Sequence, residues 1–549
     1  MIVGAGSAGC VLANRLTEDG AHRVLLLEAG RDSSGHRSLV ALPVAWLTAA
    51  ATPRLGWGFE AEEERSTDLR RIPQPRGKLL GGTSSINGMM VSRGNRGDYD
   101  RWRGMGLPGW GFEEVLPYFK RMETSWRGAG PFHGGSGPLA VSRQPADRFI
   151  TPRMLEAARR LGYQEREDFQ GPEQAGFGLP DFTIRRGRRE STAVAYLAPA
   201  LRRRNLCVET GAQATRILME RGRAVGVEYL KQGERRSARA AGEVILAAGA
   251  FNSPQLLLLS GIGPPQELAA AGIETVHPLM GVGKNLQDHP LVAAVFEAAS
   301  PCTFERTLRL DRFALALARW RLTGTGPLAA NPISVQGFLR LAGADAAGAG
   351  AADTGAGRGN RGSGDKSWPD VQFQVSHVSM LARPWFPGWR RGAGHQFTAV
   401  VLSLRPQGRG EVTLRSADPL APPRIRLGLA ATEADRRTAR EMLRLARRFF
   451  ATEPVSSLVR RELAPGPAAQ SDEALDAYVR ATIQTGAHPA CTCAMGAGEL
   501  AVLDAALRVR GIEALRVADA SSMPDVVSGN TNVPTIMIAE KASDLILGR

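Results

Sequence analysis

"MIVGAGSAGCVLANRLTEDGAHRVLLLEAG", residues 1–30, decides the fold of this chain. Gly4, Gly6 and Gly9 form a G-x-G-x-x-G motif between a short apolar strand and a segment with apolar residues at helical spacing. A second apolar run follows and ends in Glu28. Strand, tight turn, helix, strand and acid in this order predict a Rossmann-like dinucleotide-binding unit. The helix N-terminus would face the pyrophosphate, and Glu28 would bind ribose hydroxyls.

The three glycines have separate expected tasks. Gly4 would allow the tight turn, Gly6 the close approach of backbone amides to a phosphate, and Gly9 the packing of helix on strand. Only residues 1–3 precede Gly4, whereas a buried strand usually has about 5–6 residues. We therefore expect either that the natural start lies upstream or that this strand is frayed.

Length and composition indicate a large globular protein rather than a disordered or membrane-spanning chain. The sequence has 549 residues, of which 43% are hydrophobic and 22% charged, enough for two domains or one two-part fold. The charge-free stretch at 244–266 contains prolines and glycines, so we interpret it as a buried strand and helix rather than a membrane span. The odd number of cysteines and the lack of a secretory signal favour a cytoplasmic protein, and leave peripheral association with the inner membrane face open.

The net charge of +15 comes almost entirely from arginine. Such an excess attracts nucleic acid or anionic lipid in some proteins, but it also follows from a genome rich in Arg, Ala and Gly codons. The chain has only short basic clusters, at 185–189 and 202–204. We interpret them as solvated surface and expect no nucleic-acid partner.

Other segments give a coarse mixed α/β pattern. Residues 136–143 and 223–249 read as strands, the second region with a polar hairpin, and residues 151–163 and 433–451 read as amphipathic helices. Residues 342–365 are almost entirely Ala, Gly, Asp, Arg and Asn. We expect them to be a disordered surface insertion without chemistry.

A second glycine-rich cluster, "PRGKLLGGTSSINGMMVSRGN" at 75–95, favours FAD over NAD. Its small residues permit close approach to a flat ring, for which a nicotinamide enzyme has no evident need. This cluster and four later blocks resemble the glucose–methanol–choline (GMC) flavoprotein oxidoreductases, in particular the choline dehydrogenase-like alcohol dehydrogenases. The later blocks are "GAFNSPQLLLLSGIGP", "GVGKNLQDH", "HPACTCAMG" and the segment from Val517 to Ile546.

The resemblance implies an α/β fold in which a Rossmann-like FAD domain is interleaved with a substrate domain built on an antiparallel sheet with helices. The FAD region would cover 1–300, with substrate-domain segments near 145–200. The substrate domain would cover mainly 300–480, and 481–549 would return to the FAD domain with catalytic residues.

His488 in "HPACTCAMG" admits several interpretations. It could ligate a metal with Cys491 and Cys493, support a catalytic thiol, sit in the core, or act as a general base. Structural zinc usually needs four ligands, and no second Cys/His pair lies nearby, so we expect no metal. The resemblance makes His488 the base that titrates near neutral pH, with Asn532 holding the alcohol while hydride passes to flavin N5.

The resemblance also assigns residues to the cofactor. It places these along FAD: Gly4, Gly6, Ser7, Ala8, Gly9, Glu28, Ala29, Arg76, Gly81, Gly82, Thr83, Asn87, Gly88, Met89, Ala214, Asp519, Asn530 and Val533. His289 lies in a matching block, and we expect it to have a structural role.

Two departures from the family pattern bear on function. Ile86 stands where members that attach FAD covalently have histidine, so we expect non-covalent FAD. Ala487 stands where choline-acting members commonly have tyrosine; a lost ring weakens binding of a quaternary ammonium and enlarges the pocket.

We therefore predict oxidation of a neutral primary alcohol to the aldehyde, with electrons passing to a quinone or other acceptor. Choline itself as substrate, an oxidase using O2, and a flavin protein without turnover remain alternatives, and the oligomeric state is open.

Overall fold

The computed structural model describes residues 1–32, 34–147, 149–341, 368–379 and 381–549, so the expected insertion at 342–365 lies outside the described residues. The first sheet is parallel, with the order β11-β2-β1-β15-β26. Its strands are β1 (Ile2–Val3), β2 (Val24–Glu28), β11 (Leu206–Thr210), β15 (Val244–Leu246) and β26 (Leu515–Val517). Both residues of β1 are buried and pair with β2 and β15, so the strand is not frayed.

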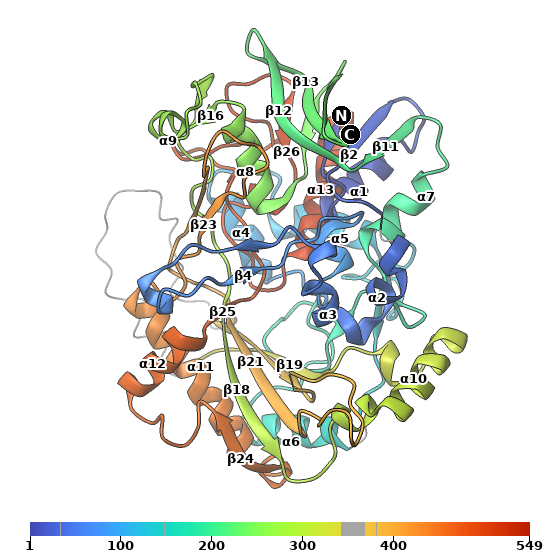
Figure 1. Ribbon diagram of the computed structural model, residues 1–549, viewed down its shortest axis with the longest axis vertical. Helices are drawn as coiled ribbons and strands as arrows, with labels where there is room; N and C mark the ends of the chain where they lie inside the picture. Colours follow the sequence, from blue (N-terminus) through green and yellow to red (C-terminus); the bar gives the residue numbers. More distant parts are fainter. Residues whose placement is uncertain (33, 148, 342–367, 380) are drawn as a thin grey trace.

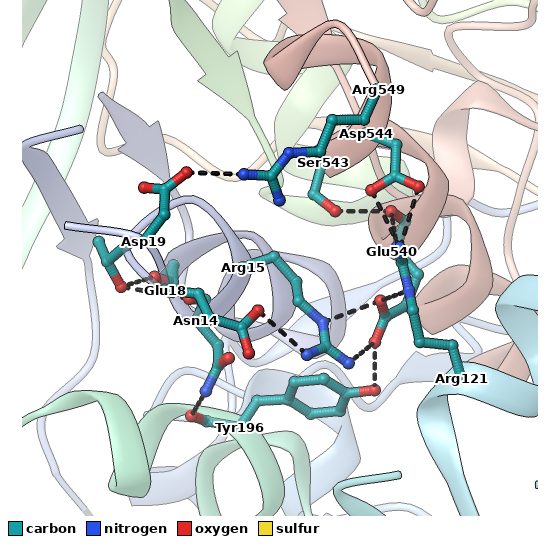
Figure 2. Close-up of polar contacts among 12 residues, drawn as sticks. Asn14, Arg15, Glu18, Asp19, Arg121, Tyr196, Glu540, Ser543, Asp544 and Arg549 are labelled. Atoms are coloured by element: carbon teal, nitrogen blue, oxygen red, sulfur yellow. Dashed lines mark hydrogen bonds and ion pairs between the residues drawn. The ribbon is translucent and has the colours of Figure 1, made fainter. Parts of the chain in front are cut away.

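Helices α1 (Ser7–Arg15) and α13 (Asn532–Leu547) pack together beside this sheet, where both chain ends lie (Figure 1). A buried carboxylate joins them. Glu540 is fully buried and accepts hydrogen bonds from Arg15 (Nε, 2.9 Å), Arg121 (Nε, 2.8 Å) and Tyr196 (Oη, 2.8 Å), as Figure 2 shows. The carboxylate therefore fixes the helix of the glycine motif against the C-terminal helix.

The second large sheet is antiparallel and has the order β24-β18-β21-β20-β19-β7, with β25 paired to β18. Its strands are β7 (Gly176–Gly178), β18 (Pro290–Ala298), β19 (Ile333–Leu339), β20 (Val371–Ser376), β21 (Gln396–Ser403), β24 (Val459–Ala464) and β25 (Gln484–Thr485). Residues of alternate strand positions, such as Val292, Phe373 and Val401, join a core with α11 (Glu433–Ala451). The other face of the sheet is consequently free to form a cavity wall.

The remaining helices surround these two sheets. They are α2 (Arg37–Ala41), α3 (Trp46–Ala50), α4 (Arg96–Gly104), α5 (Phe112–Met122), α6 (Ile150–Arg160), α7 (Ala198–Ala200), α8 (Gly249–Leu259), α9 (Pro265–Ala270), α10 (Leu310–Thr323) and α12 (Asp472–Thr482). In Figure 1, α11 and α12 flank one side of the large sheet and α10 projects from the other side.

Smaller sheets complete the fold. Their strands are β3 (Phe59–Glu60), β4 (Pro73–Gln74), β5 (Glu123–Ser125), β6 (Leu139–Arg143), β8 (Asp181–Phe182), β9 (Ile184–Arg185), β10 (Arg188–Arg189), β12 (Ala212–Glu220), β13 (Arg223–Lys231), β14 (Glu234–Arg239), β16 (Ile262–Gly263), β17 (His277–Pro278), β22 (Glu411–Thr413) and β23 (Arg424–Arg426). The chain is thus a mixed α/β protein whose five-stranded parallel sheet and large antiparallel sheet are separate, while the small β5-β6-β8 sheet contains both kinds of pairing.

The sequence-based elements are confirmed. The segment at 136–143 contains β6, 223–249 contains β13, β14 and β15, and the predicted helices are α6 and α11. The charge-free stretch at 244–266 forms β15 and α8, and no helix in the described part of the chain is long and apolar enough to cross a membrane. Strand β18 belongs to the large antiparallel sheet, which therefore begins earlier in the chain than the expected boundary at 300.

Candidate active site

A cavity of about 590 Å³ lies between the two sheets. Its wall on the glycine-motif side contains Gly4, Gly6, Ser7, Ala8, Glu28, Ala29, Arg76, Gly82, Thr83, Asn87, Gly88, Met89 and Ala214. Its wall on the large sheet contains Leu291, Ala293, Ile333, Gln374, Ser376, Thr398, Val400 and Leu402. The C-terminal block adds His488, Asp519, Asn530 and Asn532. Residues from both ends of the sequence therefore meet around one space.

The glycine turn fits a phosphate group. Gly4 has φ +96°, and a Cβ there would lie 2.6 Å from the Ala247 carbonyl oxygen. A Cβ on Gly6 would meet nothing closer than that oxygen at 3.8 Å, so the backbone is open toward the cavity. Helix α1 has no side-chain cap and no acid in its first turn, which leaves amide groups and the positive end of the helix for an anion.

Glu28 ends β2 and lines the cavity. Its two carboxylate oxygens accept hydrogen bonds from the amides of Ala5 and Gly30, both at 2.8 Å. Burial raises the pKa of Glu28 to about 7, against the opposing effect of these amides. The side chain is held at the strand end, where an acid can reach the ribose of a dinucleotide.

Three of the predicted cofactor residues, Gly9, Gly81 and Val533, do not line the cavity. Gly9 packs against the Gly4 carbonyl, as expected of the third glycine of the motif. Gly81 donates its amide to the Ala5 carbonyl at 2.7 Å. Val533 is buried in the core. These three residues therefore lie behind the cavity wall rather than on its surface.

Two charged residues of the predicted set are held by the protein itself. Arg76 donates to the Ala487 carbonyl (Nη2, 2.7 Å), next to His488, and burial lowers its pKa to about 10. Asp519 accepts from the Gly249 amide at 2.8 Å and from Ser253 Oγ at 2.6 Å. Both side chains are therefore fixed before any ligand binds, which reduces the ordering cost of binding.

His488 is almost fully buried and hydrogen-bonded at both ring nitrogens. Its Nε2 lies 3.0 Å from Asn530 Nδ2, and its Nδ1 lies 3.0 Å from His289 Nδ1. Gln372 Nε2 donates to Asn530 Oδ1 at 3.1 Å. An amide nitrogen can only donate, so Nε2 of His488 accepts and the neutral ring carries its proton on Nδ1, toward His289.

The expectation that His488 titrates near neutral pH is wrong. Burial, followed by the neighbouring His289 and Arg76, holds the pKa of His488 well below its ordinary range. Burial likewise lowers the pKa of His289 to about 4. The imidazole of His488 is consequently neutral at neutral pH, with a lone pair on Nε2.

Asn532 lines the same cavity but does not contact His488. Its Oδ1 accepts a hydrogen bond from Ser7 Oγ at 2.7 Å, which leaves the amide Nδ2 without a partner among the described residues. Asn532 is the first residue of α13. The two predicted catalytic residues, His488 and Asn532, therefore line one cavity, and Asn530, which was predicted only for the cofactor, is the amide that contacts the histidine.

The cysteines beside His488 are packing residues. Cys491 and Cys493 belong to the main hydrophobic core, and burial raises the pKa of both thiols well above their ordinary range. A reactive thiol needs the opposite shift. In the part of the chain that the structure describes, no three His, Cys, Asp or Glu residues are grouped to hold a metal ion.

Sequence reasoning missed the walls that the large sheet and α3 contribute. Trp46 and Leu47 of α3 line the cavity, as do alternate residues of β20 and β21. His289 was expected to be structural, and the structure adds that it is a direct neighbour of His488. Residue spacing alone reveals neither these walls nor the contact between His289 and His488, because β18 to β21 come together only through long-range pairing.

Comparison with known proteins gives consistent matches. Two parts of a family model described as GMC oxidoreductase match residues 1–291 and 406–539. The mitochondrial choline dehydrogenase of Mus musculus is 40% identical over 100% of this chain and 89% of that protein. The oxygen-dependent choline dehydrogenase of Chromohalobacter salexigens is 41% identical over 100% and 94%. A structure of formate oxidase from Aspergillus oryzae, studied for FAD modification, superposes with a TM-score of 0.90 at 27% identity, over 100% of this chain and 97% of that one.

Proposed function

The chain belongs to the GMC oxidoreductase family, and on this premise we propose that it oxidises a neutral primary alcohol to the aldehyde, with non-covalent FAD and with His488 as base. It is an FAD-dependent enzyme acting on CH–OH donors. The observation that carries the proposal is the acceptor state of His488 Nε2 at the wall of a cavity that also contains the glycine turn.

The cavity fits FAD. The open amides at Gly6 would hold the pyrophosphate, Glu28 the ribose, and the segment from Gly82 to Met89 the ring system. Ile86 lines the cavity within this segment and has no nucleophilic atom, which supports dissociable FAD. When bound, FAD supplies the acceptor for the hydride that leaves the alcohol carbon.

The chain's own residues would handle the proton. His488 is neutral and presents its lone pair at Nε2, where the alcohol hydroxyl would replace the Asn530 N–H. The displaced Asn530 and the partner-free Nδ2 of Asn532 would donate hydrogen bonds to the alkoxide oxygen. These donors fix the oxygen and turn the C–H bond toward the cofactor.

A neutral substrate suits the charges of the cavity. Glu28 and Asp519 are the carboxylates among its described lining residues, and each already accepts main-chain amides on the glycine-motif side. Leu291 and Ala293 form the sheet wall near His289 and His488. A quaternary ammonium is held by aromatic faces and a carboxylate. Trp46, Trp57 and Phe251 line the cavity, but both carboxylates of the described lining are already engaged, so the lining favours a neutral alcohol, although the named relatives are choline dehydrogenases.

Electron transfer to a membrane quinone is supported by a surface that we call the α10 patch, formed by α10 and residues 381–391. Hydrogen bonds between Leu310 and Trp385 join the two segments. Leu315 and Leu322 lie on the outer face of α10 and are 73% and 85% exposed, and Trp389 is 60% exposed. The helix projects at the edge of the molecule (Figure 1).

Arginines surround these apolar side chains. They are Arg312, Arg319, Arg321, Arg383, Arg390 and Arg391. Among the described residues, Arg312, Arg383 and Arg391 have no ion pair, and the acid within the patch, Asp311, pairs with Arg309. Exposed leucine and tryptophan framed by arginine are typical of binding to an anionic bilayer. We infer peripheral association with such a membrane, where a lipid-soluble acceptor resides.

The test is anaerobic. Purified protein is mixed with a panel of primary alcohols and with choline, and the flavin absorbance is followed. Loss of the oxidised flavin spectrum with a neutral alcohol supports the proposal, and faster loss with choline would favour choline dehydrogenase activity. Hydrogen peroxide yield against quinone or dye reduction then separates an oxidase from a dehydrogenase. A flavin that no alcohol reduces would refute alcohol oxidation.

A further inference from the structure

Three polar side chains lie on one face of β20, and the first of them is next to one of the residues that contact His488. Gln372, Gln374 and Ser376 alternate with the core residues Phe373 and Val375, so they face the same side of the sheet. Gln372 is the residue that donates to Asn530, the amide in contact with His488. The row therefore begins beside the reacting position.

The next two members of the row face the cavity without partners. Gln374 and Ser376 both line the cavity, and each is 7% exposed. Neither side chain makes a hydrogen bond to any residue that the structure describes, whereas Gln372 is engaged by Asn530 and Gln336. Water in the cavity can satisfy both side chains, but a ligand that displaces this water without replacing its hydrogen bonds would leave them unpaired at a cost.

The neighbours of Gln374 toward β21 and β18 are apolar, whereas Ser376 pairs with Thr398 of β21, whose hydroxyl also lacks a partner among the described residues. Gln374 pairs in register with Val400, and Val400 pairs with Ala293, both of which line the cavity. An aliphatic substrate chain would exclude water from Gln374 and Ser376 and offer them no hydrogen bond. A substrate with its own polar group would satisfy them and bury the rest of its chain on these apolar neighbours.

We propose that the substrate carries a second, uncharged hydrogen-bonding group, a hydroxyl or carbonyl, which Gln374 and Ser376 bind. Residues two apart on a strand are separated by about 7 Å. Gln374 thus lies about one such step, and Ser376 about two, from the position of Gln372 beside Asn530. The inference rests on the proposed alcohol oxidation and names its substrate class as hydroxylated or carbonyl-bearing primary alcohols.

Matched substrates test it. The holoenzyme is reduced anaerobically with 1,4-butanediol, 1,5-pentanediol and 1,6-hexanediol, and each diol is compared with the alkanol in which a methyl group replaces the second hydroxyl. We expect one diol to reduce the flavin roughly 10- to 100-fold more efficiently than its alkanol, because the alkanol leaves polar groups unpaired.

Variants test whether Gln374 and Ser376 cause the preference for the diol. Gln374→Met, which keeps the length of the side chain, and Ser376→Ala should each reduce the diol preference, while Gln396→Met on the neighbouring strand should keep it. Flavin content and spectrum verify that each variant is folded.

Alkanols that reduce the flavin as well as the diols do, or a preference that survives both substitutions, would overturn this inference and leave alcohol oxidation standing. A flavin reduced by no alcohol would overturn both.

Discussion

Replacing Asn530 by aspartate should convert a pH-independent reaction into a pH-dependent one. In the native protein Asn530 donates to His488 Nε2 at 3.0 Å, and the pKa of His488 is held well below its ordinary range. The base is therefore unprotonated at neutral pH, and flavin reduction should show no acid limb in the ordinary range of histidine. Asn530→Asp exchanges the N–H donor for a carboxylate without changing the size of the side chain.

The carboxylate should act on His488 in two ways. An opposite charge within hydrogen-bonding distance raises the pKa of a histidine by roughly 1–3 units, or about 1.4–4 kcal/mol at about 1.36 kcal/mol per unit. It also favours a proton on Nε2, the atom from which the base must act. Because the folded-state pKa rises, the unprotonated base is lost at low pH and returns as the pH increases through the raised pKa.

The assay is anaerobic stopped-flow reduction of the flavin by a saturating alcohol at a series of pH values. For Asn530→Asp we expect an acid limb moved upward by roughly 1–3 pH units and a lower rate throughout. Asn530→Ala removes the hydrogen bond without adding charge, so its rate should fall but its profile should stay flat. A flat profile for Asn530→Asp, with normal flavin content, would refute the assigned state of His488.

Three further predictions concern the cofactor, the core and the surface. Acid precipitation should leave all flavin in the supernatant because Ile86 offers no nucleophile; flavin in the pellet would disprove non-covalent binding. Glu540→Ala should lower the free energy of unfolding in urea by about 3–5 kcal/mol, since it removes the buried partner of Arg15 and Tyr196. Glu18→Ala, which removes an exposed partner of Arg15, should change it by less than about 0.5 kcal/mol. Equal effects would contradict the network of Figure 2. Leu315→Glu combined with Leu322→Glu should abolish sedimentation with vesicles containing phosphatidylglycerol, while Leu500→Glu, on another exposed leucine outside the α10 patch, should retain it. Vesicle binding unchanged in the double variant would rule out the α10 patch.

The N-terminal unit was readable from sequence because its constraints are local. Gly4, Gly6, Gly9 and Glu28 lie within one strand–helix–strand unit, and each answers a steric or electrostatic need at that point of the chain. The amphipathic helix α11 was equally visible through its spacing of apolar residues.

The wall of the cavity on the large sheet was not readable in the same way. Gln374 and Ser376 lie on a strand whose place depends on pairing between β20 and β21, and spacing does not reveal that pairing. The contact between Asn530 and His488 was also not readable from the sequence. Two asparagines near a helix start differ in direction, and only the packed positions of Ser7 and Gln372 decide which contacts the histidine.

The most direct test of the account is the rate constant of flavin reduction in His488→Ala. With a saturating primary alcohol under anaerobic conditions, we predict a rate roughly 10²–10⁴-fold below that of the native enzyme, at unchanged FAD content. The cavity would still hold the cofactor and the alcohol, but no lone pair would receive the hydroxyl proton. A variant that reduces its flavin at the native rate would contradict the assignment of His488 as the base.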